Sequence, residues 1–190
     1  MFFDSQYLLL VMLPSLILSG LAQFFVRSTY SKWSNVQNQR KLAGSQVGLA
    51  IIQSSGLQGV RLEGTPGELT DHFDPATNVV RMSESVASRP SVAAMAIVAH
   101  ELGHAQQYQE KSILIAARGF LLPAVRISPT ISYGLILGGL FMNAAGLIQL
   151  GIIFFGITVL FMLLTLPVEI DASMRGMRLL RASGIASSEE

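Results

Sequence analysis

Two long stretches without a charged residue divide the chain. The first covers residues 5–26 and the second covers residues 127–168. A helix needs about 20 consecutive, mostly apolar residues to cross a bilayer. The first stretch therefore predicts one membrane-spanning helix, an N-terminal anchor over residues 1–26. The second is too long for one span and predicts two, a transmembrane hairpin over residues 127–166.

Turn-forming residues set the expected ends of these helices. Ser128 and Pro129 resemble a helix N-cap followed by a first-turn proline. Residues 143–146 (Asn-Ala-Ala-Gly) predict the turn of the hairpin, and its second helix is expected over residues 148–166, ending near Pro167. The anchor has no basic residue ahead of it and no evident small-residue cleavage site, so it is expected to be retained.

The region between the two stretches has the pattern of a water-facing domain, because turn residues break it into short elements. The expected elements are a helix over residues 36–55 ending at Gly56, strands over residues 59–63, 68–73 and 79–82, and a helix from an N-cap at Ser91 to about Gln109. Residues 113–126 are apolar, with two arginines and two helix breakers, and are expected to form an interfacial connector.

The composition supports membrane residence and narrows the chemistry. Only 13% of residues are charged, whereas a soluble domain carries about 25%. The net charge of +1 gives no case for nucleic-acid binding, and the chain has no Cys. Any transition-metal site must therefore use His, Asp or Glu. The chain has three histidines, which are His72, His100 and His104.

The positions of Lys and Arg predict an orientation in the membrane. All 13 lie between Arg27 and Arg126 or after residue 174, and none precedes the first span or lies in the hairpin turn. Cytoplasmic loops carry the excess of these residues. The central region and the C-terminal segment are therefore expected in the cytoplasm, and the N-terminus outside.

One short motif carries metal chemistry, His-Glu-Leu-Gly-His at residues 100–104. On a helix, His100 and His104 lie on one face, so both imidazoles can bind one zinc ion. Glu101 projects to another side, where it can take a proton from a zinc-bound water as general base. A polar helix face with two solvated histidines is the weaker alternative, because two of only three histidines have this spacing. Gly103 would let another backbone approach closely.

A catalytic zinc ion usually has three protein ligands and one water. No histidine follows the motif, so the third ligand must be acidic. Glu110 projects from a different helix face, and the two acidic residues at positions 189 and 190 are expected in a flexible tail. Glu169 and Asp171 remain, both just after the last span. Glu169 is the predicted ligand, and the alternative is that it only pairs with a nearby arginine.

Three segments resemble the YugP-type membrane zinc metallopeptidases of bacteria. They are residues 69–75 (Leu-Thr-Asp-His-Phe-Asp-Pro), 99–105 (Ala-His-Glu-Leu-Gly-His-Ala) and 166–173 (Leu-Pro-Val-Glu-Ile-Asp-Ala-Ser). The resemblance extends over nearly the whole chain. It implies a peptidase with one catalytic zinc ion per chain, embedded in the bacterial cytoplasmic membrane.

Together, pattern and resemblance predict the fold class. It is an α-helical integral membrane protein with a small α+β zincin-like catalytic domain and about three transmembrane helices. The catalytic domain and connector are expected over residues 27–126. A cytoplasmic segment with the third ligand is expected over residues 167–190.

The chain is similar, more distantly, to HtpX-like and CAAX-prenyl proteases. Their acidic motif is E-x-x-x-D, whereas here the residue four after Glu169 is Ser173. Asp171 is only two residues away. It could orient a ligand imidazole, or it could simply form an ion pair with Arg175.

Three further features have both a catalytic and a structural interpretation. His72 could stabilise a developing oxyanion or be a turn histidine held by its aspartate neighbours. Tyr108 shares the helix face of His104 and could help close the site or only pack. The strand over residues 79–82 could pair with an extended substrate.

The expected function is a zinc-dependent endopeptidase that hydrolyses peptide bonds at the cytoplasmic face of the membrane. Protein or peptide substrates are expected, among them membrane proteins or their exposed tails. The alternative is a zinc-stabilised, non-catalytic membrane adaptor or scaffold, which would keep both histidines but would not need Glu101. A transporter subunit is less consistent with spans that lack a central ionisable residue.

Overall fold

The computed structural model describes residues 5–186. The first four residues of the expected anchor and the expected flexible tail at Glu189 and Glu190 lie outside this range. The helical elements are α1 (Ser5–Tyr7), η1 (Leu8–Met12), α2 (Leu13–Ser34), α3 (Gly44–Ser55), α4 (Glu84–Ser88), α5 (Val92–Gln109), α6 (Ile113–Phe141) and α7 (Ala145–Ala182). The strands are β1 (Arg61–Thr65), β2 (His72–Asp74) and β3 (Val79–Ser83).

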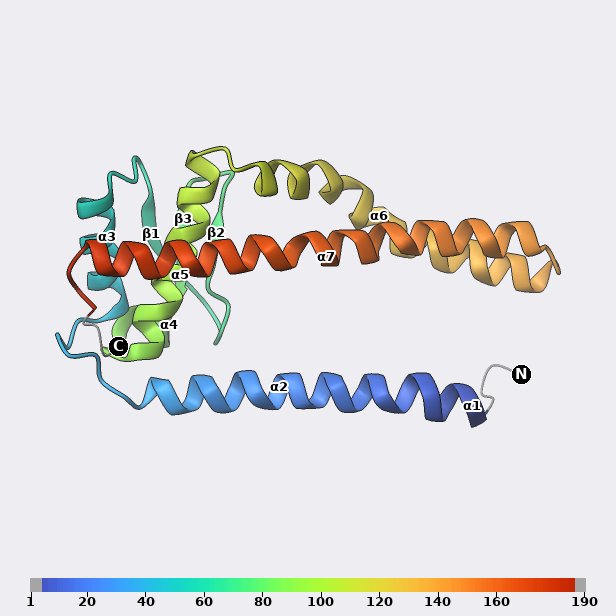
Figure 1. Cartoon of the computed structure of the whole chain (residues 1–190), viewed down its shortest axis with the longest axis horizontal. Coiled ribbons are helices and arrows are strands. Elements are labelled where there is room, and N and C mark those ends of the chain that lie inside the picture. The colour runs from blue at the N-terminus through green and yellow to red at the C-terminus, as the bar shows by residue number, and fades with distance from the viewer. Residues whose placement is uncertain (1–4, 187–190) are drawn as a thin grey trace.

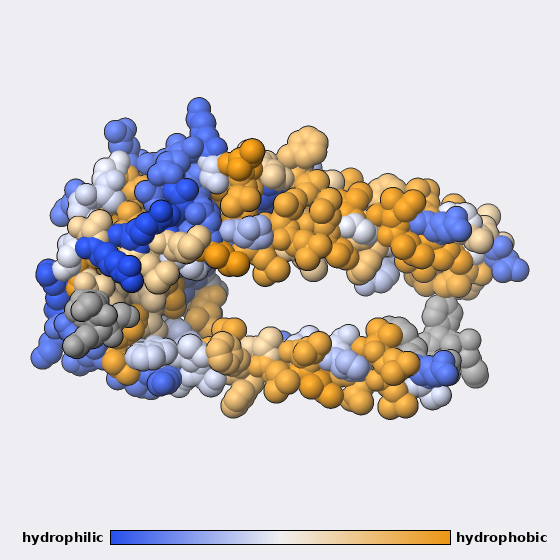
Figure 2. Space-filling view, viewed as in Figure 1, coloured by the Kyte–Doolittle hydropathy of each residue, from blue (hydrophilic) through white to orange (hydrophobic). Residues whose placement is uncertain are grey.

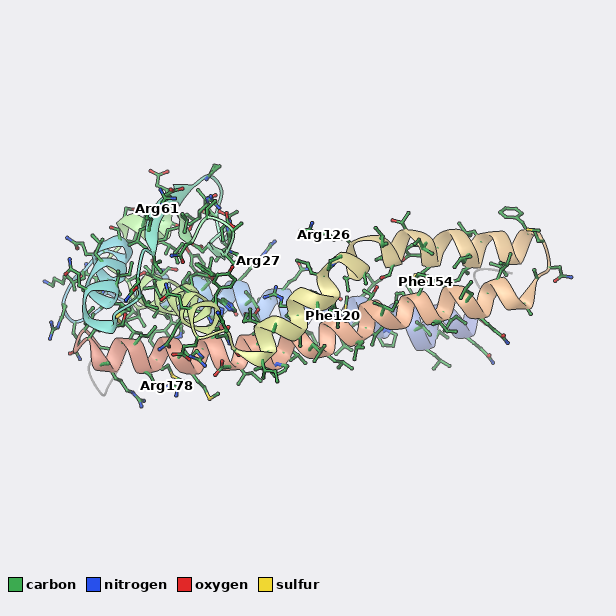
Figure 3. All side chains as sticks on the ribbon, turned by 90° about the horizontal axis from the view of Figure 1, so that it is seen from above. Arg27, Arg61, Phe120, Arg126, Phe154 and Arg178 are labelled. Carbon is green, nitrogen blue, oxygen red and sulfur yellow. The ribbon has the colours of Figure 1, made fainter. Side chains whose placement is uncertain are left out.

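A small mixed domain lies at one end of the molecule, and long helices project from it (Figure 1). In the described part of the chain, three helices are long and apolar enough to cross a membrane, over Leu8–Ser34, Ile113–Phe141 and Ala145–Ala182. Their shafts are covered by hydrophobic side chains, whereas the domain surface is largely hydrophilic (Figure 2). The predicted fold class is therefore confirmed. Seen from above, Phe154 lies within the α6–α7 hairpin, and Arg61 and Arg178 lie at the end of the molecule that carries the domain (Figure 3).

Helix α6 begins well before the predicted start of the hairpin. Residues 113–126 form its first turns rather than a separate connector, and Pro123 and Pro129 lie inside it. Ser128 is not an N-cap, because its hydroxyl is buried and hydrogen-bonds the Thr158 hydroxyl of α7 at 3.0 Å. A proline removes one backbone hydrogen bond, but a packed neighbouring helix can hold the bent helix together.

Helix α7 also continues past its predicted end, through Pro167 to Ala182. The prediction that the helix ends near Pro167 is wrong, because packing against α5 and α6 outweighs the one lost hydrogen bond. Val168 and Ala172, which follow the proline, are fully buried. Glu169 is thus held on a rigid helix rather than on a separate segment. The hairpin turn covers residues 142–144 and overlaps the predicted turn, with Asn143 at a left-handed φ of 53°, and α7 begins at Ala145, earlier than predicted.

Residues 36–43 are not helical, so the helix predicted from residue 36 begins only at Gly44. The Asn38 side chain accepts from the Leu42 N–H at 2.9 Å and donates to its carbonyl at 2.7 Å. Such side-chain bonds offer the backbone an alternative to a helix. Gly56, at a left-handed φ of 70°, ends the helix as predicted.

The three strands form one mixed sheet in the order β1-β3-β2. β3 pairs in parallel with β1 and antiparallel with β2. β3 therefore has no free edge, and the prediction that residues 79–82 pair with substrate is wrong. The free edges for strand addition belong to β1 and β2.

Helices α5 and α7 cross in close contact at two glycines. A methyl group on Gly103 would overlap the Ala172 carbonyl oxygen, and one on Gly176 would lie 2.7 Å from the Ala99 carbonyl oxygen. The predicted close approach at Gly103 is confirmed. The crossing brings the His-Glu-Leu-Gly-His turn of α5 against the Glu169 turn of α7.

Gly103→Ala is expected to separate the two helices and lower the melting temperature of the detergent-purified protein. Overpacking a tight contact costs about 1–3 kcal/mol, and here the obstacle is backbone that has little room to shift. The control is Gly134→Ala, where the added methyl group meets open space. Equal melting temperatures for the two variants would contradict the crossing described above.

Candidate metal centre

Three side chains from α5 and α7 converge at the crossing. Nε2 of His100 lies 3.2 Å from Oε2 of Glu169, and Nε2 of His104 lies 3.3 Å from the same oxygen. The donor atoms of the three residues lie within 4.8 Å of one another, so the group could hold a metal ion. The structure thus brings together the three residues that the sequence predicted as ligands.

The other ring nitrogen of each histidine has its own partner. Nδ1 of His104 lies 3.0 Å from Oε1 of Gln107, and Nδ1 of His100 lies 3.1 Å from the Ser173 hydroxyl. An amide oxygen can only accept, so Nδ1 of His104 carries the proton and Nε2 keeps its lone pair for a metal. Ser173 occupies the position of the aspartate in the E-x-x-x-D motif and contacts the other histidine.

Gln107 connects the ligand face of α5 to Asp171. It is fully buried, and its amide N–H group donates to the Val168 carbonyl at 2.9 Å and to Asp171 at 2.7 Å. Asp171 also accepts from Arg175 at 2.8 Å, and Arg175 pairs in turn with Glu110. The predicted ion pair of Asp171 with Arg175 is therefore present, and Asp171 reaches His104 only through Gln107. Sequence reasoning missed Gln107, although its spacing of three residues from His104 on one helix indicated proximity.

Gln107→Met is expected to weaken zinc binding by about 10–100-fold, because His104 loses the acceptor that orients it. Competition with a chromogenic chelator measures the affinity, and thermal unfolding is recorded alongside because Gln107 is buried. The matched control is Gln109→Met on the same helix, whose amide contacts only the Gln58 backbone among the bonds described. Equal zinc affinities for the two variants would remove Gln107 from the metal centre.

Glu101 lies beside the three converging residues and is 9% exposed. Its Oε2 accepts a hydrogen bond from the Phe73 N–H of β2 at 2.8 Å. Burial raises the pKa of Glu101, while nearby His100 and the Phe73 N–H act in the opposite direction. The backbone contact from β2 fixes the carboxylate at the edge of the sheet and was not foreseen from the sequence.

A cleft of about 640 Å³ opens over these residues, between β2, α5 and the first turns of α6. Tyr108 lines it, and its ring also packs on Phe73 with the ring centroids 6.0 Å apart. Arg118 lines the opposite wall, with Nη1 3.9 Å from Oε1 of Glu169. The sequence did not indicate this place for Arg118, because no local pattern brings the first turns of α6 beside the site.

His72 also lines this cleft, on β2. Its Nδ1 lies 2.8 Å from the Thr70 carbonyl oxygen and therefore donates to it. The aspartates beside it have other partners, since Asp71 binds Ser83 and Asp74 binds Arg81. Hydrogen bonding by Arg81 lowers the pKa of Asp74 to about 2. The interpretation that the aspartate neighbours hold His72 is wrong, since the Thr70 backbone does so.

The fold and this site define a helical membrane protein with a candidate His₂Glu metal site on a His-Glu-x-x-His helix. The model of the family described as "Putative neutral zinc metallopeptidase" matches residues 8–190. The chain belongs to this family. It is 38% identical over 178 residues to the "Putative membrane protease YugP" of Bacillus subtilis (strain 168). The matched region covers 94% of this chain and 79% of that protein. No solved structure matches the chain.

Proposed function

We propose that this chain is a membrane-embedded zinc endopeptidase, with zinc held by His100, His104 and Glu169. The observation that carries the proposal is the convergence of two imidazole Nε2 atoms on one carboxylate oxygen, with Glu101 beside them in the same cleft. A His₂Glu set with an open position suits catalytic zinc. Membership of a zinc metallopeptidase family supports the choice of metal.

Glu101 has the position and environment of a general base. Zinc, when bound, would polarise the scissile carbonyl and make the attacking water more acidic. The Phe73 N–H holds Oε2 of Glu101, which leaves the second oxygen to accept a proton from that water. Glu101 then returns the proton to the leaving amine, which completes hydrolysis of the peptide bond.

Two other predicted residues have supporting roles in this proposal. His72 would donate from Nε2 to the oxyanion of the tetrahedral state. It can do so only as an imidazolium, because its Nδ1 proton is engaged by the Thr70 carbonyl. Asp171 would act through Gln107, holding the amide whose oxygen orients His104.

The proposed substrates are extended protein segments at the cytoplasmic membrane surface. The cleft adjoins the edge strand β2, so an extended chain would lie along β2 rather than beside the central strand β3, while the Phe73 N–H of β2 stays bound to Glu101. Its other wall is the first part of α6, at the foot of the membrane hairpin. The distribution of Lys and Arg supports a cytoplasmic domain and an external N-terminus.

The proposal is tested by hydrolysis of an unfolded protein, such as reduced casein, by the detergent-purified, zinc-loaded chain. Wild type is compared with Glu101→Gln. Product peptides are identified by mass spectrometry, which also locates the cleaved bonds.

A further inference from the structure

A second cavity lies next to the catalytic cleft and is walled by the membrane anchor. It has a volume of about 750 Å³ and lies between the C-terminal half of α2 and the first turns of α5. No charged residue is found among the described residues that line it. It therefore suits an apolar occupant and offers no cation to hold a phosphate headgroup. The side chains that line this apolar groove include Phe25, Tyr30, Trp33, Val92, Ala96 and Ile97.

The apolar groove and the catalytic cleft are consecutive along one face of α5. Ala96 lines the groove and precedes His100 by four residues, and Ile97 precedes Glu101 by the same interval. Residues four apart on a helix project on the same side, one turn from each other. The face of α5 that forms one wall of the groove thus continues directly into the wall that carries the metal centre.

The chain that leads into β2 also runs along both cavities. Leu69 lines the groove, and Asp71, His72 and Phe73 line the cleft. Leu69 has a left-handed φ of 55°, a conformation that is unfavourable for a residue with a bulky side chain. The residue is 46% exposed and lines the apolar groove two residues before Asp71, which lines the cleft. Such strain persists where the surrounding structure enforces it, and functional sites are the usual places.

The open space between the membrane helices also ends near the groove. The anchor helix and the α6–α7 hairpin are separated by an open space that ends at the domain (Figure 2). No residue of α2 is buried, so this face of the anchor is available. An apolar chain leaving the bilayer between α2 and the hairpin would arrive beside α2, which forms one wall of the groove.

We propose that the apolar groove is an extended substrate subsite that binds apolar side chains of the polypeptide being cleaved. A helix rises about 1.5 Å per residue and an extended chain about 3.3 Å. The stretch of α5 from Ala96 to His104 therefore matches an extended peptide of about four residues. The preferred substrate is an unfolded apolar segment, such as the end of a transmembrane segment, with apolar side chains three to five residues from the cleaved bond. This inference rests on the proposed peptidase function.

The test uses two fluorogenic peptides with the same residues around a bond that the enzyme cleaves in casein. One peptide carries leucine and the other glutamine at the third to fifth positions on each side of that bond. KM is measured for wild type and for Ala96→Phe, which fills the groove, with zinc content recorded for each. Ala96 is exposed, so the larger side chain has room without unfolding α5. The matched control is Ala182→Phe, at an exposed position at the end of α7.

The wild type is expected to show a KM about tenfold lower for the leucine peptide, since burial of apolar side chains supplies the difference. Ala96→Phe is expected to bring the KM ratio close to one with its zinc retained, and Ala182→Phe to keep the ratio of the wild type. Equal KM values for the two peptides in an active wild type would overturn the subsite alone. A preference for the leucine peptide that survives in Ala96→Phe would also overturn it. So would a loss of copurifying phospholipid from Ala96→Phe with the KM ratio unchanged, because the groove would then bind lipid rather than substrate. Absence of any hydrolysis by zinc-loaded wild type would overturn the peptidase function, and the subsite with it.

Discussion

Glu101→Gln is expected to abolish peptide hydrolysis while zinc stays bound at about one ion per chain. A positioned general acid–base group contributes about 10²–10⁴-fold to the rate, and an amide cannot accept the proton of the attacking water. The variant keeps the shape of the side chain. Its amide oxygen can still accept from the Phe73 N–H, so the edge of β2 stays in place.

The measurement compares casein hydrolysis and zinc content for wild type, Glu101→Gln and Glu84→Gln. Glu84 is an exposed glutamate in the first turn of α4 and serves as the matched control. Hydrolysis by Glu101→Gln at the wild-type rate would exclude Glu101 as the base. A wild type that binds zinc but cleaves nothing would favour a zinc-stabilised adaptor, for which Glu101 needs only its backbone contact.

Glu169→Ala is expected to lose most of the bound zinc. The substitution removes the oxygen on which both imidazoles converge, at 3.2 and 3.3 Å. Loss of a partner that only orients a ligand costs about 10–100-fold in affinity, and loss of a ligand itself should cost more. Zinc per chain is measured by elemental mass spectrometry of each purified protein, with Glu84→Ala as control.

The outcomes separate three arrangements of the site. About one zinc in wild type and clearly less in Glu169→Ala supports the His100, His104 and Glu169 set. Full zinc in both proteins would move the third ligand, with Asp171 the next candidate on α7. Asp171 would then have to leave its present partners, Gln107 and Arg175. Zinc near zero in a well-folded wild type would exclude the metallopeptidase function.

The sequence alone predicted what depends on local pattern. Uncharged stretches of sufficient length predicted the three candidate spans, because a bilayer interior accepts few charges. The spacing of His100 and His104 predicted a shared helix face, because an α-helix repeats every 3.6 residues. Ser91 was predicted as the N-cap of that helix, and its hydroxyl accepts from the Ala94 N–H at 3.1 Å.

The tertiary structure alone decided which distant residues meet and where helices end. Pro167 and Pro129 are residues that normally end or begin a helix, yet both lie inside helices, where packing outweighs the lost hydrogen bonds. Ser173 became a partner of His100, and Asp171 a partner of Gln107, only because α5 and α7 cross at Gly103. The order of the strands, and hence the position of the edge strand β2 beside Glu101, depends on pairings that no local pattern specifies. These features arise from contacts between residues far apart in the chain, and local propensity carries no information about them.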